Sequence, residues 1–192
     1  MGRTQHFITA PLAAAIALYC VGRPESVAPV GAILAGAVLG VNAPDWLEVT
    51  RPPIWVAARH GGGYWRRQSI LPHRTITHWW PLWMLLSMGL MGWWHWRPDW
   101  PLAGSLSLDI RSGCVAFLAG GWVHLLCDLP NPSGLPGACH PMSNKRRSSL
   151  RLWRSNSFWP NTIFAIVLAA IAVGMIAWLY GWLNTPFTSI HH

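Results

Sequence analysis

The stretch TIFAIVLAAIAVGMIAWLYGWL, residues 162–183, decides the class of fold. It contains no Asp, Glu, Lys, Arg or His. An α-helix needs roughly 20 apolar residues to cross the hydrocarbon core of a bilayer, and this run is long enough. The run therefore predicts a transmembrane helix, and because it carries no charged group we expect it to act as an anchor.

Four further stretches without Asp, Glu, Lys or Arg precede this run. They are Thr4–Gly22, Ser26–Pro44, Thr75–Trp96 and Ser112–Cys127. The third is also long enough to span, the first two are marginal and the fourth is short, so some of these helices would tilt or thin the bilayer. We expect an all-α protein, a polytopic membrane helical bundle of about five spans. Gly36 and Gly40 form a Gly-x-x-x-Gly motif, which favours close helix packing.

The composition agrees with a membrane protein. Charged residues make up 10% of the 192 residues, against about 25% in a typical soluble domain. This balance excludes disorder for most of the chain and argues against an ordinary soluble enzyme. The 15 tryptophans fit aromatic belts at the water–lipid boundary. The net charge of +8 comes from basic residues that flank apolar runs, which favours an anionic membrane surface over nucleic acid.

The basic residues also predict an orientation. They gather in residues 45–74 and 145–154, whereas Arg23, Arg97 and Arg111 fall in the segments of the opposite side. By the positive-inside rule we expect a multi-pass protein with a cytoplasmic N-terminus and an external C-terminus.

Histidine and aspartate mark the cytoplasmic ends of the predicted spans. The candidate metal ligands are His6, Asp45, His73, His78, His124 and Asp128. His124 and Asp128 share one helix face because they are four residues apart. His73 and His78 converge only if a turn separates them, and Thr75 or Thr77 would cap the helix that follows. Six nitrogen and oxygen ligands at one depth predict a site for one or two divalent ions, zinc first, with manganese or iron as alternatives.

Such a site predicts metal-assisted hydrolysis. The metal lowers the pKa of bound water toward about 7, and Asp45 or Glu48 would accept its proton. Arg74 would hold a phosphate oxygen. Lys145, Arg146 and Arg147 would hold an anionic headgroup, so membrane lipids are the expected partners and a lipid phosphoester the expected substrate class.

The same residues resemble the YdjM-type family of inner-membrane metal-dependent hydrolases. The resemblance covers roughly Thr4–Arg154. It is carried by His6, Pro44-Asp45, HRTITH at residues 73–78, GWVHLLCDLPNPSG at residues 121–134 and the basic stretch PMSNKRR at residues 141–147. Three departures stand out: Thr75 replaces a glycine, Asn131 replaces a threonine, and the acidic Glu48 comes one place later than usual.

The resemblance implies a helical hydrolase of the bacterial inner membrane, with a distant similarity to zinc-dependent phospholipase C. We expect residues 1–160 to form a domain of four spans with cytoplasmic loops, and residues 161–192 to form the last span and a tail. One alternative is a non-catalytic protein whose structural metal ties helix ends together. Another is a membrane-tethered regulatory or assembly factor whose basic segment, Lys145–Arg154, binds a protein or nucleic acid.

Overall fold

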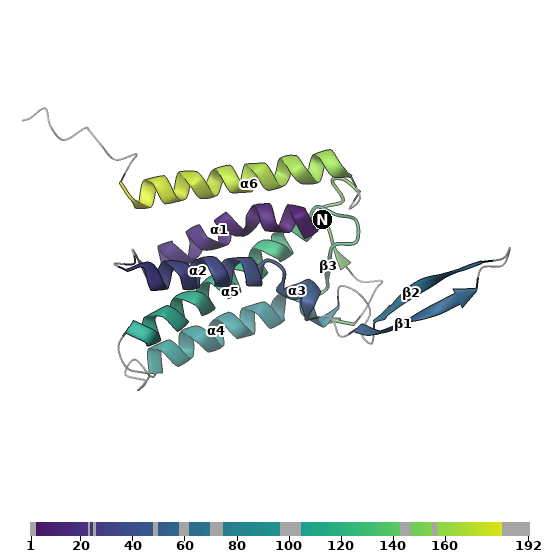
Figure 1. Ribbon diagram of the computed structural model, residues 1–192, viewed down its shortest axis with the longest axis horizontal. Helices are drawn as coiled ribbons and strands as arrows, with labels where there is room; N and C mark the ends of the chain where they lie inside the picture. Colours follow the sequence, from purple (N-terminus) through teal and green to yellow (C-terminus); the bar gives the residue numbers. More distant parts are fainter. Residues whose placement is uncertain are drawn as a thin grey trace, which may run out of the picture.

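The computed structural model describes residues 3–22, 24, 26–47, 50–57, 62–69, 75–96, 105–142, 147–154 and 157–181. The described chain is mostly helical (Figure 1). Its α-helices are α1 (Arg3–Val21), α2 (Val27–Gly40), α3 (Ala43–Trp46), α4 (Trp80–Trp96), α5 (Ser105–Asp128) and α6 (Phe158–Leu179). A short 3₁₀ helix, η1 (Ile76–His78), precedes α4. The strands are β1 (Thr50–Ala57), β2 (Gly63–Ser69), β3 (Leu135–Pro136) and β4 (Arg147–Ser148).

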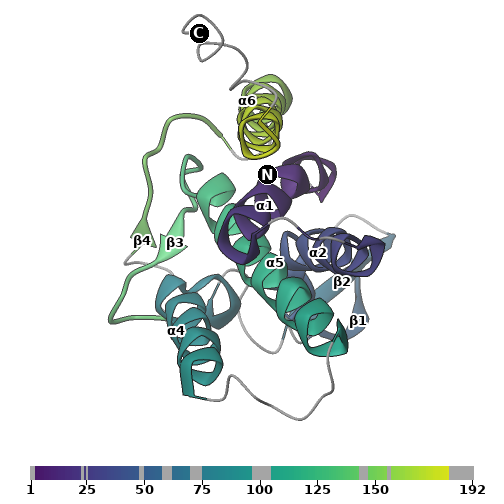
Figure 2. The same cartoon turned by 90° about the vertical axis from the view of Figure 1, so that its left-hand side faces the viewer.

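Helix α5 lies at the centre of the bundle. It packs against α1, α2 and α4, and α6 packs on the far side of α1 (Figure 2). Alanines dominate the core between these helices, among them Ala13 and Ala15 of α1, Ala37 of α2 and Ala116 of α5. Small side chains let helix backbones approach closely, which is the usual way helices associate in a membrane.

Glycines bring α2 and α5 into backbone contact. A Cβ atom on Gly36 would lie 2.2 Å from the carbonyl oxygen of Gly113, and one on Gly40 would lie 2.1 Å from that of Phe117. From the other side, a Cβ atom on Gly120 would lie 2.6 Å from the backbone nitrogen of Val41. The Gly-x-x-x-Gly motif therefore does form a close helix contact, as its sequence predicts.

Several helix boundaries differ from those expected. Helix α5 begins at Ser105 and not near Ser112, because Asp109 and Arg111 are accommodated within the helix. The expected third span begins as η1, and α4 starts only at Trp80. Proline suits the first turn of a helix, which explains why Pro81 stands there.

The lengths of the helices bear on the number of spans. Among the residues that the structure describes, two stretches are long and apolar enough to cross a membrane, Asp109–Asp128 and Phe158–Leu179. Gln5–Val21 and Val27–Gly40 are apolar but shorter. A bundle of five spans stays a prediction.

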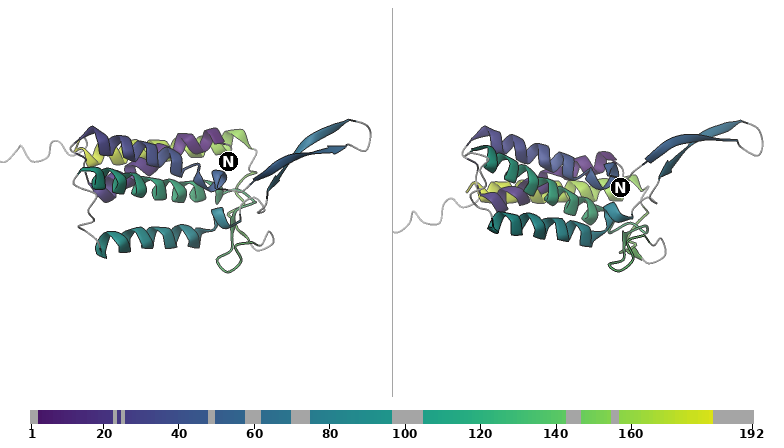
Figure 3. Two further views of the ribbon diagram at one scale, coloured as in Figure 1. Left: turned by 60° about the horizontal axis from the view of Figure 1, so that its bottom comes forward. Right: turned by 90° about the horizontal axis from the view of Figure 1, so that it is seen from below.

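A β-hairpin corrects the expectation of a purely helical chain. Strands β1 and β2 pair antiparallel, with Trp55 opposite Trp65. Their hairpin projects from the end of the bundle at which the N-terminus lies (Figure 3). The segment was expected to be a loop, but aromatic and β-branched residues on either side of a glycine run are the pattern of a hairpin. Strands β3 and β4 form a second antiparallel pair.

Candidate metal centre

Five of the six predicted ligands meet at the end of the bundle from which the hairpin projects. They come from four elements: His6 from α1, Asp45 from α3, His78 from η1, and His124 and Asp128 from α5. The other predicted site residues, Glu48, His73, Arg74, Lys145 and Arg146, lie outside the described residues. The structure thus brings five side chains from separate helix ends close together, and their role as metal ligands stays a prediction.

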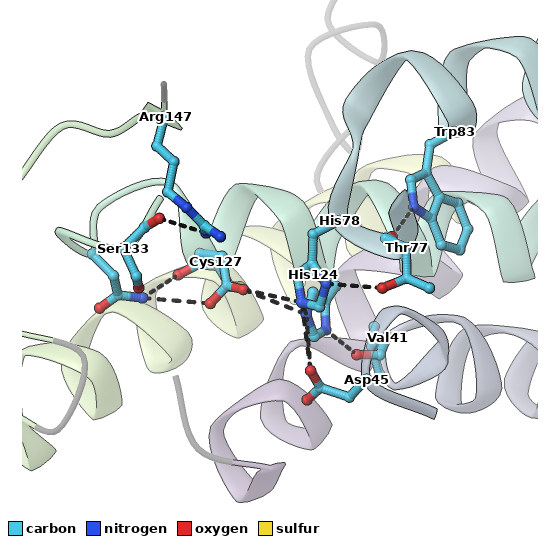
Figure 4. Close-up of polar contacts among 11 residues, drawn as sticks. Val41, Asp45, Thr77, His78, Trp83, His124, Cys127, Ser133 and Arg147 are labelled. Atoms are coloured by element: carbon cyan, nitrogen blue, oxygen red, sulfur yellow. Dashed lines mark hydrogen bonds and ion pairs between the residues drawn. The ribbon is translucent and has the colours of Figure 1, made fainter. Parts of the chain in front are cut away.

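The cluster is built around two imidazole nitrogens (Figure 4). His78 Nε2 and His124 Nε2 lie 3.2 Å apart. Asp45 Oδ1 lies 3.4 Å from the former and 3.9 Å from the latter. On the other side, Asp128 Oδ2 lies 3.5 Å from His78 Nε2 and 3.6 Å from His124 Nε2. Four potential ligand atoms therefore converge on one small volume.

These separations fit a metal ion. Two ligands of a tetrahedral zinc, each about 2.0–2.1 Å from the ion, lie about 3.3 Å apart. The five measured distances run from 3.2 to 3.9 Å, close to that value. The donors are imidazole and carboxylate, a set that suits zinc, manganese and iron.

His6 adds a fifth side chain. Its ring stacks on that of His124, with centroids 4.0 Å apart and planes 9° from parallel. His6 is 1% exposed, and its Nδ1 has no hydrogen bond to any described residue. Burying a polar atom without a partner costs free energy, and a metal ion bound to this nitrogen would supply the missing partner. His6, Asp45 and His124 form one potential ligand group, and His78, His124 and Asp128 form another.

Hydrogen bonds at Nδ1 fix the ring orientation of two of the histidines. His124 Nδ1 lies 2.7 Å from the carbonyl oxygen of Val41. A carbonyl only accepts, so Nδ1 donates and Nε2 keeps its lone pair for a metal. His78 Nδ1 lies 3.1 Å from the hydroxyl of Thr77, which again leaves Nε2 toward the cluster.

The segment around His78 is held from two sides. The indole N–H of Trp83 donates to the Thr77 carbonyl at 2.8 Å, and that of Trp79 donates to the Ala138 carbonyl at 2.8 Å. Thr75 is the N-cap residue of η1 but makes no capping hydrogen bond through its side chain. The expected capping role is therefore wrong for Thr75, and the hydroxyl of Thr77 supports His78 instead.

The protonation state of Asp45 also favours a cation. Burial alone would raise the pKa of the Asp45 carboxyl. The hydrogen bond to His78 and the nearby imidazole of His124 outweigh burial and lower this pKa to about 2. At neutral pH the Asp45 carboxyl is therefore ionised, the form in which a carboxylate binds metals.

Comparison with known families now places the chain. The family model of the YdjM inner membrane protein matches residues 1–189. The chain belongs to the YdjM inner membrane protein family. The match includes α6 as well as the helices that carry the ligands, and the two long apolar helices agree with a membrane protein. No curated protein and no solved structure matches the chain.

Some residues around the centre of this YdjM-family chain were not among the predicted site residues. Asn131 is fully buried, and its side-chain amide lies 3.5 Å from Asp128 Oδ1 and 3.4 Å from the Cys127 carbonyl. The Val41 carbonyl was missed because every residue has a carbonyl, so nothing in the sequence singles this one out. The supporting role of Thr77 could have been proposed from the sequence, because Thr77 is adjacent to the predicted ligand His78.

Replacing Thr77 with valine tests the support of His78. Valine keeps the shape of threonine but cannot bond the imidazole, and the loss of such a partner costs about 10- to 100-fold in metal affinity. We expect zinc affinity to fall within that range, as measured by competition with a chromogenic chelator. Thr77→Ser keeps the hydroxyl and should bind zinc almost as the wild type does; equal affinity of Thr77→Val and the wild type would contradict this role.

Proposed function

We propose that this YdjM-family protein is a metal-dependent hydrolase that acts at the cytoplasmic face of the inner membrane on a phosphoester or phospholipid-type substrate. The observation that carries the proposal is the convergence of His78, His124, Asp45 and Asp128 with ligand-atom separations of 3.2 to 3.9 Å. Under this proposal the cluster holds one or two divalent ions, zinc first.

Asp45 is the member of the cluster that meets solvent. Its side chain is 24% exposed, whereas those of His78 and Asp128 are 0% and 1% exposed. A substrate would therefore approach from the side of Asp45. When bound, the metal would supply a water of lowered pKa. Asp45 or Glu48 would take a proton from the attacking water as its oxygen attacks phosphorus, and would return that proton to the ester oxygen, which would leave as an alcohol.

Positive charge supports an anionic substrate. Arg74 follows the predicted ligand His73, and Lys145, Arg146 and Arg147 follow the segment after α5. In the described part of this segment, Arg147 donates to the Ser133 carbonyl at 2.9 Å, which ties the basic stretch to the chain that leaves α5. Arginine pairs well with phosphate oxygens, so lipid headgroups are the proposed partners.

A structural metal is the second candidate function. His6, His78, His124 and Asp128 are each at most 1% exposed, and they come from three separate elements. A metal enclosed by protein ligands alone would tie these elements together without catalysis, because catalytic sites keep a position for water.

One experiment separates the two candidates. The detergent-purified protein, loaded with zinc, is mixed with vesicles of phosphatidylethanolamine and phosphatidylglycerol, and lipid products are followed by mass spectrometry. We expect hydrolysis that a chelator stops, that added zinc restores, and that Asp45→Asn lowers by at least about 100-fold. Bound zinc with four or more protein ligands, no coordinated water by X-ray absorption and no hydrolysis would support the structural role and overturn the catalytic one.

A further inference from the structure

Two apolar cavities flank α4. One, of about 620 Å³, lies between α2, α4 and α5. The other, of about 520 Å³, lies between α1, α4 and α5. Leu90 of α4 and Leu118 of α5 line both cavities and separate them. In Figure 2, α4 lies beside α5 at the edge of the bundle.

The cavity between α2, α4 and α5, here called the α2–α4 groove, lies along the helices that lead to the metal centre. Gly113 and Phe117 line it, and they share a face of α5 with His124, which lies eleven and seven residues further along the helix. Phe117 lies roughly 10 Å from His124 along the helix axis. The other two walls of the groove also connect to ligands. Helix α2 is followed by α3, which bears Asp45, and η1, which bears His78, lies just before α4.

Trp83 connects the groove wall to the segment that bears His78. It is 0% exposed, its ring centroid is 5.9 Å from that of Phe117, and its indole N–H donates to the Thr77 carbonyl. Trp83 thus packs on the groove wall at Phe117 while its polar atom is already bonded. The lining of the groove is almost wholly apolar, with Leu39 and Leu86 on opposite walls. Its acidic member, Asp109, lies near the end of α5 that is away from His124.

These features define the kind of molecule that fits. A volume of about 620 Å³ is in the range of small-molecule pockets, roughly 300–1,000 Å³. Leu39 and Leu86 are 44% and 45% exposed, so the groove is open at the surface of the bundle. One of its walls, α5, is long and apolar enough to cross a membrane, so we expect an opening beside it to face hydrocarbon. The occupant available there in excess is the acyl chain of a lipid.

We propose that the α2–α4 groove binds an acyl chain of a membrane phospholipid and holds the phosphate of that lipid at the metal centre. The second half rests on the proposed function; the binding of the chain does not. The groove would act as the part of the substrate site that recognises hydrocarbon, and the ligand cluster as the part that recognises phosphate.

The cavity between α1, α4 and α5 serves as a control. It is lined by Trp122, which is two residues from His124 and so points to the other side of α5. Its polar wall atoms bond to each other, since the Trp122 indole N–H donates to the Ser87 hydroxyl at 3.1 Å. It is also mostly apolar but does not follow the face of α5 that bears the ligands.

The test uses a phosphatidylglycerol with a photoreactive diazirine in one acyl chain, incorporated in vesicles with the full-length protein. Cross-linked peptides are mapped by mass spectrometry. Ala35→Trp and Leu86→Trp fill the α2–α4 groove from opposite walls, and Met91→Trp fills the other cavity from α4. We expect labelling of groove residues to fall about tenfold in the first two variants, the affinity lost when roughly two methylene groups lose their burial. Met91→Trp should leave it unchanged.

The outcomes separate the groove from the metal chemistry. Labelling that persists in His124→Ala would support chain binding even if the metal-dependent reaction failed. Uniform labelling of the exposed face of α6, with no preference for the groove and no effect of Ala35→Trp or Leu86→Trp, would overturn the proposal. Retention of zinc by both variants would show that they fold.

Discussion

Replacing His124 with alanine is expected to remove the bound metal. His124 belongs to both potential ligand groups, it stacks on His6, and its Nε2 lies 3.2 Å from that of His78. Loss of a mere supporting partner costs about 10- to 100-fold in affinity, so loss of a shared ligand should cost more than about 100-fold. Elemental mass spectrometry of the purified protein should find one or two equivalents of metal in the wild type and none in His124→Ala.

Two further variants make this measurement specific. His78→Ala should lose the metal as His124→Ala does, because His78 contacts both carboxylates of the cluster. His140→Ala is the matched control, since His140 is an exposed histidine that belongs to neither ligand group. Metal bound equally by all three variants would show that the cluster is not the site, and no metal in the wild type after reconstitution would refute the hydrolase proposal.

A larger side chain at Gly40 is expected to separate α2 from α5. The Cβ atom of Gly40→Val would lie 2.1 Å from the Phe117 carbonyl oxygen, and backbone cannot move aside as a flexible side chain can. Overpacking costs about 1–3 kcal/mol where side chains can adjust, so we expect roughly 3 kcal/mol or more here. The loss would appear as a lower midpoint of thermal unfolding in detergent.

The control for this prediction is Gly174→Val in α6. A Cβ atom on Gly174 meets nothing within 4 Å, while the change in helix propensity is of the same kind. Gly40→Val should also weaken metal binding, because the next residue, Val41, supplies the carbonyl that orients His124. If both variants unfold at the same temperature and bind metal alike, the close contact of α2 and α5 does not stabilise the protein.

The grouping of the ligands could be predicted because polar residues are costly inside a membrane. His6, Asp45, His78 and His124 stand out in a sequence with few charges, and alternating helix directions bring their helix ends to one side. The hairpin of β1 and β2 was missed because the arginines of its segment were interpreted only as signals of orientation. The start of α5 was missed because a charge was taken as the end of a span.

The finer geometry could not be read from the residues. Which nitrogen of His124 faces the cluster depends on the Val41 carbonyl, and that contact exists only once α2 and α5 have packed together. Likewise, the α2–α4 groove depends on where α4 lies beside α5, which the spacing of apolar residues does not fix.

The stacking of His6 on His124 also dictates the order in which the protein can mature. His6 lies in α1, whereas His124 and Asp128 lie in α5, which is synthesised only after α2 and α4. The ring of His6 therefore has no histidine to stack on until α5 has been made. Under the proposed function, we expect metal capture to be a late step of biogenesis, and a chain that stops before α5 to lack the cluster.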